Sequence, residues 1–222
     1  VANEATRDQY VASSLMEEAI HSSLFEGAVS TREAAKDMLR NADLPATRDE
    51  RMILNNYRAM LRIRELGSGP MSIELLLELH RILTEGTLED AAHAGRIQTP
   101  DQPRIEVIDE RSKRVVHRPP PAEQLPERVR RLINFANEAD ESGDRYVHPV
   151  LRSILLHFQL AYDHPFYDGN GRTARALFYW SMLRRGYWMA EFISISRLLY
   201  QKRGPYERAY QYVESDHQDA TY

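Results

Sequence analysis

Residues 164–175 read His-Pro-Phe-Tyr-Asp-Gly-Asn-Gly-Arg-Thr-Ala-Arg and join two segments with helical periodicity. Pro165 predicts the end of the first helix near Asp163, because proline lacks a backbone donor and restricts the residue before it. Gly169 and Gly171 predict a flexible turn with a new helix directly behind it. Such a stretch is usually a plain connection between helices, but a plain connection does not need a histidine, an aspartate and two arginines in this order.

The start of the second helix suits the binding of a polyphosphate. Backbone N–H groups at a helix start, loosened by Gly169, Asn170 and Gly171, form a cradle for an anion. Arg172 and Arg175 are three residues apart, so they share one face of the helix over that cradle.

Two further side chains add chemistry to this cradle. Asp168 is a hard oxygen ligand that could hold Mg²⁺ on a bound phosphate. His164 carries the side chain most ready to accept a proton near neutral pH. A base, a metal ligand and an anion site therefore fall within twelve residues.

Helical periodicity on both sides of this segment predicts an all-α fold. The sequence Thr-Arg-Asp-Glu50 matches a capping box that begins at Thr47. Residues 104–108 and 114–117 are short and β-branched, which predicts one β-hairpin. The expected helices cover about residues 8–26, 31 onward, 47–67, 72–83, 122–141, 148–163, 170–186, 192–202 and 205–217.

Composition excludes several classes of protein. The 222 residues carry 29 basic and 33 acidic side chains, a net charge of −4, which argues against a dedicated nucleic-acid binder. No cysteine is present, so a disulfide framework and a cysteine-ligated zinc are excluded. No apolar run is long enough to span a bilayer and no signal peptide stands at the start. We expect a cytoplasmic protein without a membrane or direct nucleic-acid partner.

Residues 164–175 resemble the signature of the Fic (filamentation-induced-by-cAMP) family, His-x-Phe-x-(Asp/Glu)-Gly-Asn-Gly-Arg-x-x-Arg, and match it at every fixed position. The resemblance implies a Fic-type helical bundle with a small β-hairpin flap. It divides the chain into an N-terminal helical region, 1–69, that carries an inhibitory helix, and a catalytic core, 70–222. Many relatives continue further, which is compatible with truncation at the C-terminus.

Fic enzymes typically transfer AMP from ATP to a Ser, Thr or Tyr hydroxyl of a protein. By this resemblance, His164 would deprotonate the hydroxyl, and Asp168 would bind Mg²⁺ that bridges the phosphates. Arg175 would take the γ-phosphate. The resemblance implies that the nucleotide phosphates are held by Gly169, Asn170, Gly171, Arg172 and Arg175.

The segment Ser22-Ser-Leu-Phe-Glu-Gly27 is similar to the family's inhibitory motif, (Ser/Thr)-x-x-x-Glu-(Gly/Asn). Glu26 lies at the expected C-terminal end of a helix, where a carboxylate opposes the macrodipole by roughly a few tenths of a kcal/mol. Such a glutamate is either simply solvated or has a partner elsewhere. The subgroup with an N-terminal inhibitory helix implies that Glu26 pairs with Arg175, occupies the γ-phosphate site and forces ATP into an unproductive pose.

The predicted hairpin is either an arbitrary surface feature or a flap whose edge pairs with an extended segment of a target protein. The resemblance favours the flap, with Val115, Val116 and His117 facing the site and a hydroxyl-bearing segment as partner. Tyr206 resembles a family position near the adenine and is equally compatible with a core aromatic. The chain's twelve tyrosines would also allow self-modification.

We therefore expect an autoinhibited protein adenylyltransferase, a nucleotidyltransferase that uses ATP as substrate and Mg²⁺ as cofactor. One alternative keeps the fold but uses another donor or removes AMP. A second alternative is a non-catalytic regulatory or binding module, against which the intact His164, Asp168 and Arg172 argue. The sequence does not identify the target, the oligomeric state or the signal that relieves inhibition.

Overall fold

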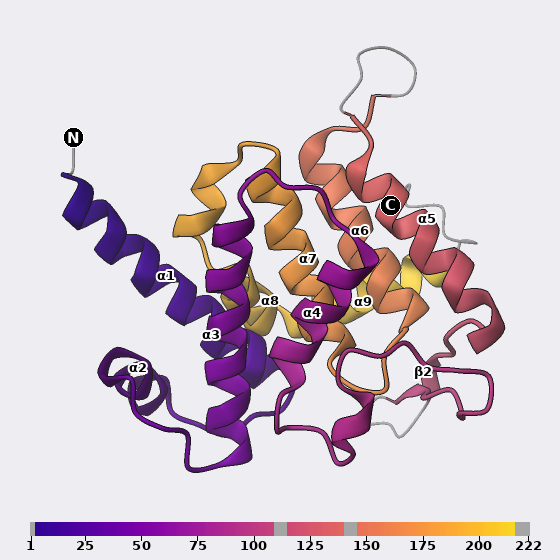
Figure 1. Ribbon diagram of the computed structural model, residues 1–222, viewed down its shortest axis with the longest axis horizontal. Helices are drawn as coiled ribbons and strands as arrows, with labels where there is room; N and C mark the ends of the chain where they lie inside the picture. The colour runs from indigo at the N-terminus through magenta and orange to yellow at the C-terminus, as the bar shows by residue number, and fades with distance from the viewer. Residues whose placement is uncertain (1–2, 109–114, 140–145, 216–222) are drawn as a thin grey trace.

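A computed structural model describes residues 3–108, 115–139 and 146–215, which form a helical bundle with one small hairpin (Figure 1). The α-helices are α1 (Glu4–Phe25), α2 (Arg32–Asn41), α3 (Arg48–Leu66), α4 (Ile73–Thr84), α5 (Leu125–Asn137), α6 (Pro149–Asp163), α7 (Asn170–Arg184), α8 (Ile195–Gln201) and α9 (Arg203–Ser215). Short 3-10 segments cover Ala91–His93, Ala122–Gln124 and Trp188–Phe192. The prediction of an all-α fold with a hairpin is confirmed.

Local capping chemistry starts several of these helices where the sequence predicts. The predicted capping box is present, because Thr47 accepts from the Glu50 N–H and the Glu50 side chain accepts from the Thr47 N–H. Ser72 caps α4 through its hydroxyl oxygen alone, which accepts from the Leu75 N–H at 3.1 Å. The start of α9 is earlier than expected, since Pro205 lies inside the first turn, where a missing N–H costs nothing.

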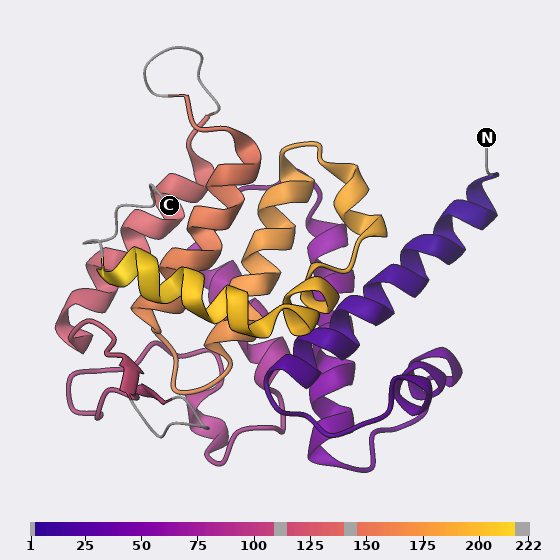
Figure 2. The same ribbon diagram turned by 180° about the vertical axis from the view of Figure 1, so that it is seen from behind.

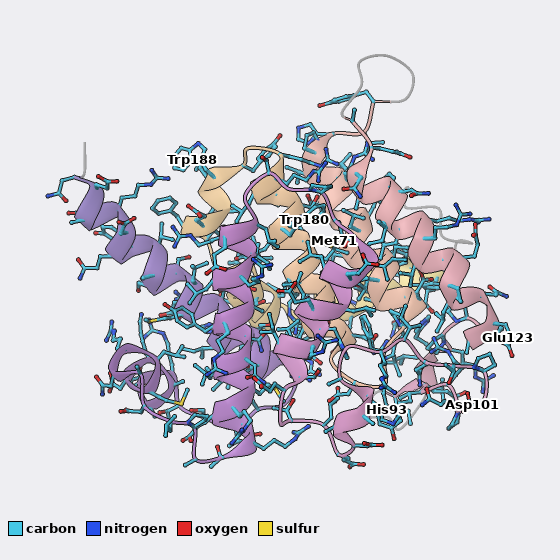
Figure 3. All side chains as sticks on the ribbon, viewed as in Figure 1. Met71, His93, Asp101, Glu123, Trp180 and Trp188 are labelled. Carbon is cyan, nitrogen blue, oxygen red and sulfur yellow. The ribbon has the colours of Figure 1, made fainter. Side chains whose placement is uncertain are left out.

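The central pair of the bundle is α6 and α7, which lie side by side and are joined by the loop after Asp163. Their apolar faces pack with those of α3, α4 and α5 around Trp180, which is fully buried. Figure 3 shows Trp180 within the bundle and Trp188 at its outer margin. Each fully buried large side chain contributes about 1.5–3 kcal/mol of hydrophobic free energy.

Helix α1 crosses the bundle and contributes to its core, although its first turns project from the body in both views (Figures 1 and 2). Val11 and Leu15 of α1 are buried in the same cluster as Trp180. The buried Glu18 carboxylate accepts hydrogen bonds from the Tyr179 hydroxyl at 3.0 Å and the Ser196 N–H at 2.8 Å. The middle of α1 is therefore fixed to both α7 and α8.

The hairpin consists of β1 (Val107–Ile108) and β2 (Val115–His117), which pair antiparallel with Val107 opposite His117. The first strand is shorter than predicted because Arg104 turns inward instead, donating to the carbonyls of Pro120 and Asp163. The predicted turn of this hairpin lies outside the described residues. Within the described ranges, no helix combines the length and the apolar content needed to cross a bilayer.

Candidate active site

The loop between α6 and α7 is closed by the side chain of Asn170. Its Oδ1 accepts from the Phe166 N–H at 2.9 Å, and its Nδ2 donates to the Phe166 carbonyl at 2.8 Å. Gly169 adopts a left-handed conformation, φ 80°, which glycine enters without steric cost. The Asn170 side chain is therefore used to hold the loop, while its backbone N–H belongs to the start of α7.

The start of α7 has the free backbone N–H groups that the predicted anion cradle requires. The N–H groups of Asn170, Gly171 and Arg172 find no acceptor on the described part of the chain, as is usual for a first helical turn. A Cβ on Gly171 would overlap Glu26 Oε1 and would lie 3.2 Å from Arg175 Nη1. The glycine therefore lets a carboxylate reach the helix start.

That carboxylate belongs to Glu26, which comes directly after α1. Glu26 Oε1 accepts from Arg175 Nη2 at 2.7 Å, the contact that the family resemblance implies. Arg175 also donates from Nε to Ser22 Oγ at 2.9 Å, and its guanidinium carbon lies 5.2 Å from the centre of the Phe25 ring. Burial raises the pKa of Glu26, but the positive charges of Arg175 and Arg172 outweigh it, so the net pKa is lowered.

The Arg172 side chain is buried between α4 and the loop that joins α6 to α7, and it does not point into solvent. Its Nη1 donates to the Leu83 carbonyl at 2.8 Å and its Nη2 to Asp168 Oδ2 at 3.3 Å, and the side chain is 1% exposed. Burial lowers the pKa of Arg172, yet a guanidinium stays charged in proteins. Its positive charge therefore reaches the cradle from below.

Asp168 faces the mouth of the site with a carboxylate that is 43% exposed. Its Oδ1 accepts from the Gly169 N–H at 2.6 Å. In the described ranges no three His, Cys, Asp or Glu side chains gather as a metal site. A single accessible carboxylate fits Mg²⁺, which is commonly held by one or two carboxylates together with substrate phosphates and water.

His164 ends α6 in a left-handed conformation, φ 48°, which is uncommon for a residue other than glycine. Its Nδ1 lies 3.3 Å from the Ala161 carbonyl, and we assign the proton to this nitrogen. Nε2 then remains free to accept a proton. Burial, helped by the charges of His117 and Arg104, lowers the pKa of His164 to about 4, so the ring is neutral at pH 7.

Sequence reasoning missed His80, which holds the loop from α4. Its Nδ1 accepts from the Gly95 N–H at 2.9 Å, so Nε2 carries the proton and donates to the Asp168 carbonyl at 2.8 Å. The ring is stacked on Phe166 with centroids 3.8 Å apart. Burial lowers the pKa of His80 to about 4. A lone histidine on a helix gives no sequence signal for this role.

The predicted flap residues point in different directions. His117 is buried, with Nε2 donating to the Tyr162 carbonyl at 2.7 Å and Nδ1 lying 2.8 Å from Glu214 Oε1. Val115 is exposed and Val116 is half-buried. His117 thus joins the hairpin to α6 and α9, while Val115 lies on the surface.

Tyr206 lies in an aromatic cluster formed by α6, α9 and the end of α1. Its hydroxyl lies 2.7 Å from His157 Nε2, and its ring contacts Phe25 edge-on with centroids 5.5 Å apart. Burial raises the pKa of Tyr206. Figure 2 shows α9 lying across this face of the bundle.

Comparisons with known proteins agree on one family. Residues 70–182 match the family described as Fic/DOC. "Protein adenylyltransferase fic-1" of Caenorhabditis elegans is 34% identical over 117 residues, which cover 53% of this chain and 20% of that protein. "Protein adenylyltransferase Fic" of Nematostella vectensis is 42% identical over 69 residues, 31% of this chain and 16% of that protein.

Two solved structures share the fold. A Fic family protein from Desulfovibrio desulfuricans G20 has a TM-score of 0.74 at 22% identity, covering 95% of this chain and 60% of its own. A Fic domain containing signaling protein from Bacteroides thetaiotaomicron VPI-5482 has a TM-score of 0.71 at 22% identity, covering 91% and 72%. The matched part of the chain spans a fifth or less of the length of the two adenylyltransferases from Caenorhabditis elegans and Nematostella vectensis.

Proposed function

The chain belongs to the Fic/DOC family, and from this premise we propose that it is a protein adenylyltransferase inhibited by its own α1. The match and the relatives named adenylyltransferases support a Fic-type transferase. The observation that carries the finer proposal is the Glu26 carboxylate, which lies on Gly171 and Arg175 at the start of α7. The position of this carboxylate supports the proposal that the cradle binds a compact anion.

In the active state, the phosphates of ATP take the place of Glu26. The free N–H groups at the start of α7 and the guanidinium of Arg175 hold the phosphate chain, and Arg172 adds its charge from below. Asp168 would hold Mg²⁺, which supplies further neutralisation of the phosphate charge. The chain's residues thus orient the α-phosphorus and stabilise the charge that develops there.

His164 Nε2 takes the proton of the target hydroxyl. The hydroxyl oxygen then forms a bond to the α-phosphorus while the bond to the leaving pyrophosphate breaks. The lowered pKa keeps the ring neutral and ready to accept a proton. Bound phosphates place negative charge nearby, which raises the pKa of His164 toward neutrality and strengthens the base.

Inhibition follows from competition between two anions for one cradle. While Glu26 pairs with Arg175, the γ-phosphate meets a like charge and finds its guanidinium already paired. We assign the chain on this basis to the subgroup with an N-terminal inhibitory helix. The proposed boundary between residues 69 and 70 then separates two roles and not two hydrophobic cores, because Val11 and Leu15 of α1 are buried in the main core.

The hairpin is proposed to receive the target. An extended segment would pair with the exposed strand edge through backbone hydrogen bonds, which tolerate varied side chains. Val115 is the exposed side chain on β2. The tie of His117 to Tyr162 and Glu214 would keep the hairpin in place during this pairing.

The test is incubation of Glu26→Gly protein with Mg²⁺ and ATP labelled at the α-phosphate, with and without cell lysate. Covalent label is expected on the protein or on a target, and it should be absent from the Glu26→Gly, His164→Ala double variant. Label from α-labelled UTP but not from ATP would mean that the chain transfers UMP and not AMP. No covalent label from any nucleotide would overturn the proposed function.

A further inference from the structure

Arg48 brings a guanidinium to the site from outside the family segment 70–182. It is the first residue of α3, a position set by the capping box of Thr47. Its Nε donates to the Thr87 carbonyl at 2.8 Å, and its Nη2 lies 3.9 Å from Asp168 Oδ2. The side chain is 56% exposed, so it lies at the mouth of the cradle.

The charge of Arg48 is unfavourable for the helix that carries it. A cation at a helix N-terminus opposes the macrodipole, just as the Glu26 carboxylate does at the end of α1. Glu26 lies at the start of α7, and Arg48 lies beside Asp168, two residues before that start. A charge that is unfavourable at its position in a helix and lies at a site is better explained by a function in that site than by helix stability.

The contact with Asp168 does not account for Arg48 either. Asp168 already has the Arg172 guanidinium at 3.3 Å and the Gly169 N–H at 2.6 Å. A separation of 3.9 Å is too long for a hydrogen bond, and ion pairs this exposed contribute little to stability. The guanidinium of Arg48 therefore keeps donors to spare, since it has five N–H groups and Thr87 takes one.

The anchor of Arg48 is firm. Thr87 is buried, and its N–H and hydroxyl both donate to the Thr84 carbonyl at 3.1 Å. The last turn of α4 holds Arg172, through the Leu83 carbonyl. The end of α4 and the loop behind it thus hold two guanidiniums near Asp168, the buried one of Arg172 and the exposed one of Arg48.

We propose that Arg48 binds the phosphate chain of ATP directly. Its Nε stays on the Thr87 carbonyl, Nη2 turns from Asp168 to a phosphate oxygen, and Nη1 donates to a second one, since phosphate oxygens match the planar fork of a guanidinium. The Asp168 carboxylate would then be available to bind Mg²⁺. This inference rests on the proposed function, because it needs ATP in the cradle.

The test compares Arg48→Gln with Arg51→Gln, both in the Glu26→Gly background. Arg51 is the matched control, because it lies one turn further along α3 and packs on Gly86 without a contact to Asp168. Dissociation constants for ATP and adenosine are measured by calorimetry with Mg²⁺. Arg48→Gln should weaken ATP about five- to tenfold and leave adenosine unchanged, while Arg51→Gln changes ATP less than about twofold.

A double-variant comparison separates a direct contact from an effect through Asp168. If Arg48 binds phosphate, Arg48→Gln also weakens ATP in the Asp168→Asn background; if it acts only by neutralising Asp168, that effect disappears and the proposal is overturned. Equal ATP affinities in the Arg48→Gln and Arg51→Gln proteins would overturn it as well. Should Arg48→Gln fail to fold, Arg48→Met against Arg51→Met, which also removes the charge, gives the same two outcomes.

The failure of the proposed function looks different. If Glu26→Gly protein binds no ATP at all, the proposed function fails and the role of Arg48 fails with it. If it binds ATP and transfers AMP, but Arg48→Gln binds ATP as tightly as the control, only the inference about Arg48 is wrong.

Discussion

Replacing Glu26 by glycine removes the anion that is proposed to compete with ATP and leaves most of the site intact. Arg175 keeps its hydrogen bonds to the Ser22 hydroxyl at 2.9 Å and carbonyl at 3.1 Å. Its guanidinium stays beside the Phe25 ring. The cradle should therefore keep its shape and gain a vacant guanidinium edge, so ATP binding and transfer should both increase.

The size of the effect follows from the contact that is lost. The Glu26–Arg175 hydrogen bond is charge-assisted at 2.7 Å, and such bonds contribute about 1.5–3 kcal/mol. Because the Glu26 side chain is 26% exposed, the lower half of this range applies. ATP affinity should rise about 10- to 40-fold, since each 1.4 kcal/mol corresponds to a factor of ten.

The assay measures the ATP dissociation constant by calorimetry and the label incorporated from α-labelled ATP, in wild-type protein and in two variants. Glu26→Gln is the matched control, because the amide keeps the length and the accepting oxygen but loses the charge. Its ATP affinity should lie between those of wild type and Glu26→Gly. The increase in affinity should thus follow the loss of charge rather than the loss of packing.

Equal affinity and equal labelling in wild type and Glu26→Gly would refute this reasoning, provided that thermal denaturation shows both to be folded. An affinity gain in Glu26→Gly with none in Glu26→Gln would also count against it. The inhibition would then be steric, and the like-charge argument would be wrong.

In the Glu26→Gly background, His164→Ala should bind ATP within about twofold of its parent while labelling falls by about 10²–10⁴-fold, and loss of ATP binding would contradict its role as a base. Asn170→Ala removes two hydrogen bonds to the backbone of Phe166 and should lower the free energy of unfolding by about 2 kcal/mol, measured by urea denaturation; an unchanged value would show that the loop does not need this bracket. Burial holds the pKa of His80 at about 4, against an ordinary 6.5, so between these values the unfolded chain binds a proton that the folded chain does not. Stability should therefore fall as pH drops through this window, by roughly 3 kcal/mol from His80 alone, and His80→Asn should flatten the slope of unfolding free energy against pH.

Helix positions were largely predictable because periodicity and caps are local properties. The Thr47 capping box and the helix stop at Pro165 are examples, and both are where the sequence places them. The starts of α8 and α9 were less predictable. The 3-10 segment Trp188–Phe192 precedes α8, and α9 begins ahead of Pro205, because packing decides such short elements.

The candidate site shows the same division between local and distant information. The motif from His164 to Arg175 is contiguous, so its chemistry can be read from one stretch of sequence. His80 and Arg48 reach the site from distant positions, and no spacing rule connects them to it. Helical spacing places Arg172 and Arg175 on one face, but only the arrangement of α4 determines that Arg172 is directed under the loop.

The way in which α1 is held limits how the proposed inhibition could be relieved. Glu18 and Ser23 are tied to α8 and α3, the latter through the Asn56 amide at 2.8 Å, so the helix cannot detach without opening the core. Glu26 comes after these anchors, and a terminal turn frays at far lower free energy than a buried segment. If Glu26 inhibits as we propose, fraying of that single turn would be enough to open the site, and bound ATP would shift the population toward the open form.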